Sequence, residues 1–378
     1  MNNISTQKPQ IALILTGGGA RAAYQVGILK ALKTGLPRSH KSPFRIICGT
    51  SAGSINATQL ACHASCYHLG VKKLEWAWKN FDTSEVYHSD FRRVFGHLIN
   101  GMLANFQSDY ANVKPASLFN NSPLNTLLSR IIDLRRIDRN LQGGHLDALC
   151  ITASSYSDGD SISFFQANNK NEWRRAKRKG IKAKITIEHL LASSAIPLVF
   201  PSIKINRQYY GDGSVHQLSP LSPAIHLGAE KIFIIGVDQP HEAKFYGQHQ
   251  HHPGMAYISG HLLDTIFADT LSADVERMER INQTLDLIPN FESKTTLRKV
   301  ESMIVNPSHD FDTIANEFYF DMPWAIRGLL RWAGVNEHTE SSLVSYLLFE
   351  QNYTKRLIDL GYEDGMNKLD EIRTFLEL

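Results

Sequence analysis

A serine between two glycines, Gly49-Thr50-Ser51-Ala52-Gly53, lies at the junction of two different sequence patterns. The apolar run 44–48 before it is typical of a short buried strand, and residues 54–61 after it are typical of a helix. Glycine on both sides suits a tight strand-to-helix turn, in which a G-x-S-x-G sequence exposes its serine hydroxyl near helix N–H groups. The same letters also fit a plain glycine-rich turn with a helix-capping serine.

A second glycine loop, Gly17-Gly18-Gly19, follows the apolar run 11–15 and precedes a helix-like segment. With the strand at 44–48 this predicts a β-α-β unit, in which both glycine turns lie at the carboxyl ends of parallel strands and face one crevice. Gly17, Gly19 and Ala22 fit a loose dinucleotide fingerprint, but the second strand ends in the serine turn where an acidic residue is needed. The other interpretation is a loop whose N–H groups stabilise a negatively charged oxygen.

A serine hydroxyl needs a base to become a nucleophile. The serine turn comes directly after the first helix, which argues against the α/β-hydrolase order of serine, acid and histidine. His216 and His226 are candidates without a signature. Asp212 follows a predicted strand and precedes a helix, so it can reach the same crevice, whereas Asp158 lies in a hairpin turn and Asp364 between C-terminal helices.

Four ordered segments now carry a resemblance: Gly17 to Arg21, Gly49 to Gly53, the run 192–197 and Asp212-Gly213. In this order they resemble the patatin-like phospholipases, and residues 271–282 and 345–350 are similar to the helical extension of bacterial members. The resemblance implies an α/β fold of three layers, α/β/α, with a mostly parallel central sheet and a helical C-terminal extension.

The resemblance also implies roles for individual residues. Ser51 would be the nucleophile and Asp212 the base, with no histidine, metal or other cofactor. The oxyanion hole would consist of Gly17, Gly18 and Gly19. The supporting residues would be Arg21, Gly49, Gly53 and Gly213. Two positions depart from the family pattern, because Ala22 replaces a glycine and Ser214 follows Asp212-Gly213.

We expect a catalytic domain over residues 8–240 and a helical extension over 241–378 that packs on it. Leu74, Trp76, Trp78 and Phe81 are predicted core residues. Residues 91–106 are expected to form a packed helical insertion, or else a cap over the site. The His-rich loop 248–252 lacks a regular metal-ligand spacing, and from its position alone Arg21 would be a solvated first-turn residue.

Composition sets limits on partners. The chain has 378 residues, 43% hydrophobic and 20% charged, with a formal net charge of +3. That balance gives no indication of nucleic-acid binding, and no apolar run is long enough to span a membrane. The four cysteines show no C-x-x-C spacing, which favours reduced thiols and a cytoplasmic location.

These observations predict a serine acyl hydrolase that acts on phospholipids or lysophospholipids. The rivals are an esterase or acyltransferase on small soluble esters, and an inactive scaffold that binds acyl chains or a partner. The basic run 174–184 is interpreted as a solvated loop or as a contact with an anionic membrane. The tryptophan-rich segment 323–332 is interpreted as a helix that packs its apolar face on the catalytic domain or as an interfacial helix in peripheral contact with the membrane. The oligomeric state stays open.

Overall fold

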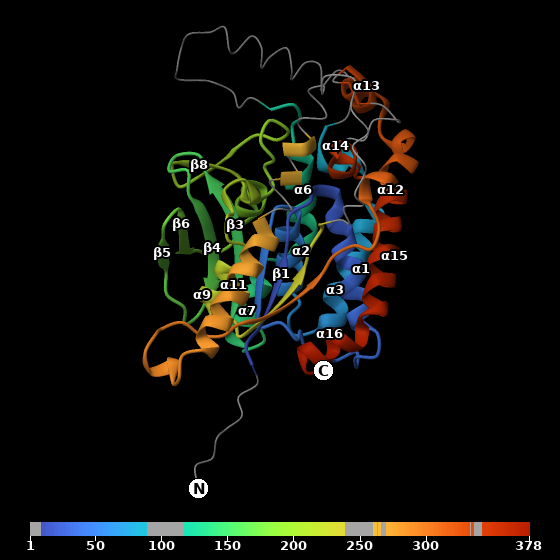
Figure 1. The fold of residues 1–378 in the computed structure, drawn as a ribbon. Helices are drawn as coiled ribbons and strands as arrows, with labels where there is room; N and C mark the ends of the chain where they lie inside the picture. Colours follow the sequence, from blue (N-terminus) through green and yellow to red (C-terminus); the bar gives the residue numbers. More distant parts are fainter. Residues whose placement is uncertain are drawn as a thin grey trace, which may run out of the picture.

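Helices cover both faces of a central β-sheet in the computed structural model of the chain (Figure 1). The structure describes residues 9–88, 117–238, 260–262, 264–265, 270–332, 334–335 and 342–378. Across these residues the sheet has ten strands, and its main path runs in the order β10-β9-β1-β2-β3-β4-β6-β5.

Five neighbouring strands of this sheet are parallel, and two of them lead into the glycine loop and the serine turn. They are β10 (Glu301–Val305), β9 (Lys231–Ile235), β1 (Ile11–Leu15), β2 (Ile46–Thr50) and β3 (Ala148–Ser155). Beyond β3 lie β4 (Ser161–Ala167), β6 (Arg178–Lys182) and β5 (Trp173–Arg175). The antiparallel pair β7 (Ile203–Ile205) and β8 (Gln208–Asp212) joins the end of β3. Because parallel strands end at one edge, the loops after β1 and β2 are neighbours.

The apolar residues of β1 alternate between two separate cores, as expected for a strand buried on both faces. Leu13 and Leu15 belong to one core, and Ala12 and Ile14 to the other. The first core is completed by α1 (Ala23–Lys33), α2 (Ala52–Ala61), α3 (Tyr67–Asn80) and α15 (Gln351–Asn367). The second is completed by α9 (Ser222–Leu227) and α11 (Thr270–Asp286). The predicted three-layer α/β/α fold is therefore confirmed.

Shorter helices surround these layers. Before β9 they are α4 (Thr83–Val86), α6 (Ser122–Ile131), α7 (Arg135–Gln142) and α8 (Ile187–Ser193), with the 3-10 turns η1 (Gly19–Ala22) and η2 (Gly213–His216). After β9 they are α12 (Phe311–Glu317), α13 (Trp324–Trp332), α14 (Leu343–Leu347) and α16 (Leu369–Leu376), with η4 (Phe291–Ser293) and η5 (Tyr319–Asp321). Of the helices in the described ranges, none is both long and apolar enough to cross a membrane.

Helix α15, in the C-terminal part of the chain, lies directly against the first helix, α1 (Figure 1). Two glycines allow the close approach. A Cβ atom on Gly27 would lie 2.2 Å from the carbonyl oxygen of Ile358, and one on Gly361 would lie 2.2 Å from that of Tyr24. The backbones of the two helices therefore meet without intervening side chains.

The C-terminal part is helical as predicted, with one exception. Strand β10 extends the central sheet beside β9 and was not predicted, so the C-terminal part also contributes to the sheet. A domain boundary at residue 240 stays a prediction.

Two finer predictions were wrong. Trp76 is 60% exposed rather than part of the core, although Leu74, Trp78 and Phe81 are buried as expected. Residues 174–182 of the basic run belong to the β5–β6 hairpin, which we call the basic hairpin, instead of forming a loop. The predicted insertion or cap at 91–106, the His-rich loop 248–252 and part of the predicted helix 256–285 lie outside the described residues.

Candidate active site

Ser51 lies between the end of β2 and the start of α2, in a backbone conformation that side chains rarely adopt. Its φ is 53° and its ψ is −133°. Neither flanking glycine has room for a side chain. A Cβ on Gly49 would lie 2.5 Å from the carbonyl oxygen of Gly53, and one on Gly53 would lie 2.4 Å from that of Leu15. The turn is therefore strained and tightly enclosed, which is typical of functional sites.

Asp212 is the last residue of β8, and it is fully buried next to this turn. The pairing of Asp212 with Ala153 of β3 carries it to the edge where β2 ends. Its Oδ2 atom accepts a hydrogen bond from Oγ of Ser51 at 2.5 Å, and its Oδ1 atom accepts one from the N–H of Ser214 at 2.9 Å. The structure thus brings together the two residues that the sequence singled out.

Burial raises the pKa of Asp212 to about 7, even though the hydrogen bonds from Ser51 and Ser214 lower it. Desolvation disfavours the charged carboxylate, so the carboxyl changes its protonation state close to neutral pH. A group with such a pKa can take a proton from a hydroxyl and return it within one reaction.

Ser193 fixes the serine turn from the opposite side, and the sequence did not reveal this role. Its hydroxyl accepts a hydrogen bond from the N–H of Ser51 at 2.9 Å and donates one to the carbonyl oxygen of Thr152 at 2.6 Å. It therefore links the turn to β3. The sequence signal was the run 192–197, which carried the family resemblance but had no assigned function.

The glycine loop lies at the same edge of the sheet, between β1 and η1. Gly19 has a φ of 55°, and a Cβ there would lie 2.3 Å from the carbonyl oxygen of Tyr346. Gly18 is less confined, since its Cβ would lie 3.0 Å from a methyl group of Val237. The first N–H groups of a helical turn have no partner within the turn, so N–H groups of this loop can donate to a substrate oxygen.

A cavity of about 340 Å³ begins at Ser51 and Gly19 and runs between α2, α3 and α6. Along α2 its wall includes Ala52 together with Ser51, Ile55 and Gln59. The last three share one face because they are four residues apart. Most of the lining is apolar, including Leu74, Trp78, Phe81, Val86, Leu124, Leu127, Leu128, Ile132, Ile196, Phe200 and Phe349. An apolar cavity of this kind suits a hydrocarbon chain.

The two candidate histidines contact other groups. The ring of His226 stacks on Trp173 at 5.0 Å between centroids, and its Nδ1 atom lies 2.8 Å from the carbonyl oxygen of Ser222. The main-chain N–H of His216 donates to Oγ of Ser154. Within the described part of the chain, Asp212 is the one side chain that hydrogen-bonds the hydroxyl of Ser51.

Arg21 differs from the prediction made from its position, because it is buried instead of solvated. Its side chain is 2% exposed and lies beside Asp264 and Asp312. The physical reason is the C-terminal part of the chain, which covers the start of α1 and supplies both carboxylates. Neither acidic residue had a sequence signal that linked it to the glycine loop.

A model of the patatin-like phospholipase family matches residues 13–225, more than half of the chain. The chain belongs to the patatin-like phospholipases. Membership of this family supports the assignment of lipid ester hydrolase activity.

One curated relative is the cGAMP-activated phospholipase of Pseudomonas aeruginosa (strain BWHPSA011 / Pa011), which is 26% identical over 205 residues. The match covers 54% of this patatin-like chain and 52% of the relative, so the chain spans about half of that protein's length.

A search of solved structures matched two proteins at 12% identity each. Human GIVD cytosolic phospholipase A2, in complex with a fluorophosphonate inhibitor, has a TM-score of 0.46, with 98% of this chain and 59% of that one covered. VipD from Legionella pneumophila has a TM-score of 0.40, with 97% and 67% covered.

Proposed function

We propose that this patatin-like protein is a serine acyl hydrolase that cleaves acyl esters of phospholipids or lysophospholipids through a Ser51–Asp212 dyad. The observation that carries the proposal is the 2.5 Å contact between these two side chains, with Ser51 in the wall of an apolar cavity. Family membership supports the same reaction class.

The reaction begins when Oγ of Ser51 attacks the acyl carbonyl carbon while Asp212 takes the hydroxyl proton. The oxyanion that forms is held by N–H groups of Gly18 and Gly19, with Gly17 shaping the loop. Asp212 returns its proton to the leaving alcohol as the ester C–O bond breaks, which leaves an acyl-enzyme. Water then loses a proton to Asp212, attacks the acyl carbon and releases the free acid, and the proton returns to Ser51.

The cavity would hold the acyl chain during these steps. It is lined by side chains of α2, α3 and α6, and its lining also includes the exposed residues Lys73, Trp76 and Arg130. An apolar chain placed there gains about 25 cal/mol for each Å² of surface removed from water. This favours long-chain acyl esters over short soluble ones, although a soluble esterase or an acyltransferase would use the same dyad. An inactive scaffold would have no need of the strained serine.

Peripheral contact with an anionic membrane is a further part of the proposal. On the basic hairpin Arg174 and Arg175 are exposed, while Lys179 pairs with Asp158 and Asp160. Near α13 three large side chains are exposed: Phe320 by 61%, Trp324 by 66% and Trp332 by 85%. Aromatic side chains beside arginines suit the lipid interface.

The decisive experiment is labelling of the purified protein with a fluorophosphonate, combined with hydrolysis of phospholipids and lysophospholipids of graded chain length. Wild type should be labelled and release fatty acid, and Ser51→Ala should do neither. The assay should be run with and without cGAMP, because the Pseudomonas relative is named as activated by it. If Ser51→Ala were labelled as strongly as wild type, Ser51 would not be the nucleophile. Labelling of wild type without lipid hydrolysis would favour the soluble esterase.

A further inference from the structure

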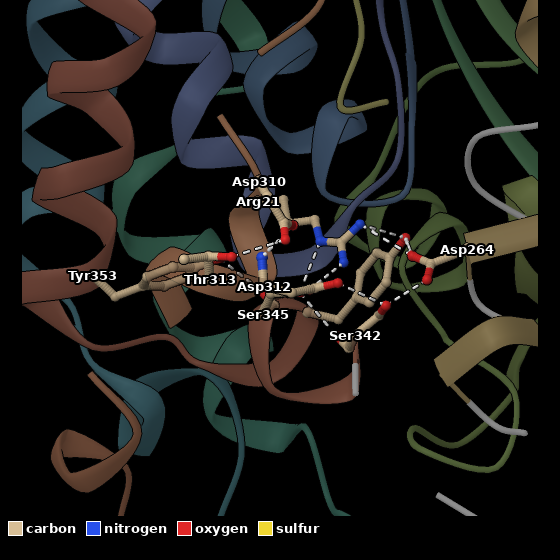
Figure 2. Close-up of polar contacts among 9 residues, drawn as sticks. Arg21, Asp264, Asp310, Asp312, Thr313, Ser342, Ser345 and Tyr353 are labelled. Carbon is tan, nitrogen blue, oxygen red and sulfur yellow. Dashed lines mark hydrogen bonds and ion pairs between the residues drawn. The ribbon is translucent and has the colours of Figure 1, made fainter. Parts of the chain in front are cut away.

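The guanidinium of Arg21 is surrounded by polar groups that all come from the C-terminal part of the chain (Figure 2). Its Nε atom donates to Oγ of Ser345 at 2.9 Å. One terminal nitrogen donates to Asp264 at 3.2 Å and to the hydroxyl of Tyr346 at 3.1 Å, and the other donates to Asp312 at 2.8 Å. The Tyr346 ring also stacks on the guanidinium, 3.9 Å from its carbon.

The two carboxylates are held in place in turn. The hydroxyl of Ser342 lies within hydrogen-bond distance of both Asp264 and Asp312 and can donate its one proton to either, and Ser345 donates to Asp312 at 2.6 Å. Burial alone would lower the pKa of Arg21, but Tyr346, Asp312 and Asp264 raise it above its ordinary value, so the side chain stays charged. We call Arg21, Asp264, Asp312, Ser342, Ser345 and Tyr346 the arginine clamp.

The arginine clamp acts on the glycine loop at two points. Arg21 is two residues after Gly19, and its own N–H closes the loop on the carbonyl oxygen of Gly18 at 3.0 Å. Tyr346, which bonds the guanidinium through its hydroxyl, also places its main-chain carbonyl against Gly19. The same C-terminal segment thus fixes both ends of a three-residue stretch whose N–H directions matter.

A buried ion pair is weak evidence for stability, because desolvation offsets much of the attraction, but it can fix one conformation among several. Here the fixed conformation is that of the loop with the oxyanion donors. Such donors stabilise a transition state only when they point at the developing charge.

We propose that Arg21 is a positioning residue, and that Asp264 and Asp312 hold it so that the glycine loop keeps its N–H groups directed at the substrate carbonyl. The C-terminal part is then a component of the active site. This inference rests on the proposed hydrolase function, so its test needs a readout that does not depend on catalysis.

The test compares Arg21→Lys and Asp312→Asn with a matched control, Asp274→Asn. Asp274 is a buried carboxylate of the C-terminal part, whereas Asp312 is partly buried, and Asp274 accepts a hydrogen bond at 3.0 Å from the N–H of Leu221, a residue of the second core. Both clamp variants should lower kcat for a p-nitrophenyl ester about 10²-fold with little change in KM, since a misplacement of about 1 Å can cost that much. Asp274→Asn should keep the wild-type kcat.

The independent readout is amide hydrogen exchange of residues 17–22. Exchange there should become faster in Asp312→Asn and stay unchanged in Asp274→Asn, whatever the enzyme hydrolyses. A wild type without hydrolase activity would overturn the proposed function but leave this comparison intact. Equal kcat and equal exchange in the clamp variants and the control would overturn the positioning role.

Ser342→Ala is a milder variant for the case that the charge variants do not fold. It removes one hydroxyl between Asp264 and Asp312 and leaves the guanidinium and both carboxylates in place. A lower kcat with unchanged KM and faster exchange at 17–22 would support the arginine clamp. Wild-type values of all three would contradict it.

Discussion

The Oγ atom of Ser51 lies 2.5 Å from Oδ2 of Asp212, although the two residues are 161 positions apart in the sequence. Both are buried, one at the end of a parallel strand and the other at the end of an antiparallel strand. In the proposed mechanism this contact supplies a nucleophile and a proton acceptor without a third residue between them.

Replacing the base should be far more damaging than replacing either candidate histidine. Asp212→Asn should lower turnover about 10⁴-fold, which is the scale of losing the acid of a Ser-His-Asp triad. His216→Ala and His226→Ala should each stay within about tenfold of wild type, or about 1.4 kcal/mol in the barrier. Steady-state hydrolysis of a p-nitrophenyl ester measures all three. If His216→Ala were inactive and Asp212→Asn active, the assignment of Asp212 as the base would be wrong.

The raised pKa of Asp212 should appear in both activity and stability. Hydrolysis should increase with pH with a midpoint near 7, because the reaction needs the carboxylate. The free energy of unfolding should instead decrease as pH rises. Between pH 3.9, which is about the ordinary pKa of an aspartic acid, and pH 7, which is about the pKa of Asp212 in the folded chain, the unfolded chain has lost a proton that the folded chain keeps. The free energy of unfolding therefore falls as pH rises through this range and levels off above it.

Asp212→Asn separates this effect from other titrating groups. The amide oxygen can still accept from the N–H of Ser214, and the amide N–H can donate to Oγ of Ser51, without burying a charge. The variant should therefore gain stability relative to wild type as pH rises from 5 to 8. Urea unfolding at several pH values measures the difference. A difference that does not change with pH would rule out a raised pKa at this carboxyl.

The strained backbone of Ser51 should make glycine the more stable replacement. At a φ of 53° a side chain costs about 1–3 kcal/mol, so Ser51→Gly should be more stable than Ser51→Ala by that amount. Both variants lack the hydroxyl and should be inactive, which makes them a matched pair. Equal unfolding midpoints in urea would show that the turn stores no strain.

Gly19→Ala should affect turnover more than Gly18→Ala. The added methyl at Gly19 would meet the Tyr346 carbonyl in a disfavoured conformation, and displacing one oxyanion donor costs about 10²–10³ in kcat. Gly328→Ala is a suitable control, because a Cβ there meets nothing within 4 Å and alanine favours the helix. If Gly19→Ala changed only KM, the loop would be a binding element.

Charge reversal on the basic hairpin should weaken binding to anionic vesicles. Each basic residue near such a surface contributes about 1 kcal/mol, so Arg174→Glu with Arg175→Glu should reduce sedimentation with vesicles at low salt while ester hydrolysis is kept. The control is Arg135→Glu with Arg139→Glu, the same charge change on exposed residues of α7. Equal loss in both pairs would indicate a general charge effect.

The elements that the sequence revealed are those with a local pattern. The serine turn was recognisable because a strand, two glycines and a helix occur in succession, and Asp212 because Asp-Gly closes a strand. Three features lack such a pattern. Strand β10 is a short run amid helices, with exposed Glu301 at its start. Trp76 belongs to an amphipathic helix, but its side chain lines the cavity instead of packing in the core. The clamp joins Arg21 to Asp264 and Asp312 over 243 and 291 residues, and only tertiary packing brings them together.

Because α15 packs on α1, residues that are synthesised late contact residues that are synthesised early. Ser51, the glycine loop and Asp212 emerge from the ribosome well before Gly361 and the residues that surround Arg21. Until those later residues have folded back, the nascent chain carries its reacting groups on an incomplete scaffold. If the positioning role holds, a chain made only as far as residue 238 has both residues of the proposed dyad but lacks the clamp residues that hold the glycine loop, so it should be far less active than a chain in which Gly361 has packed on α1.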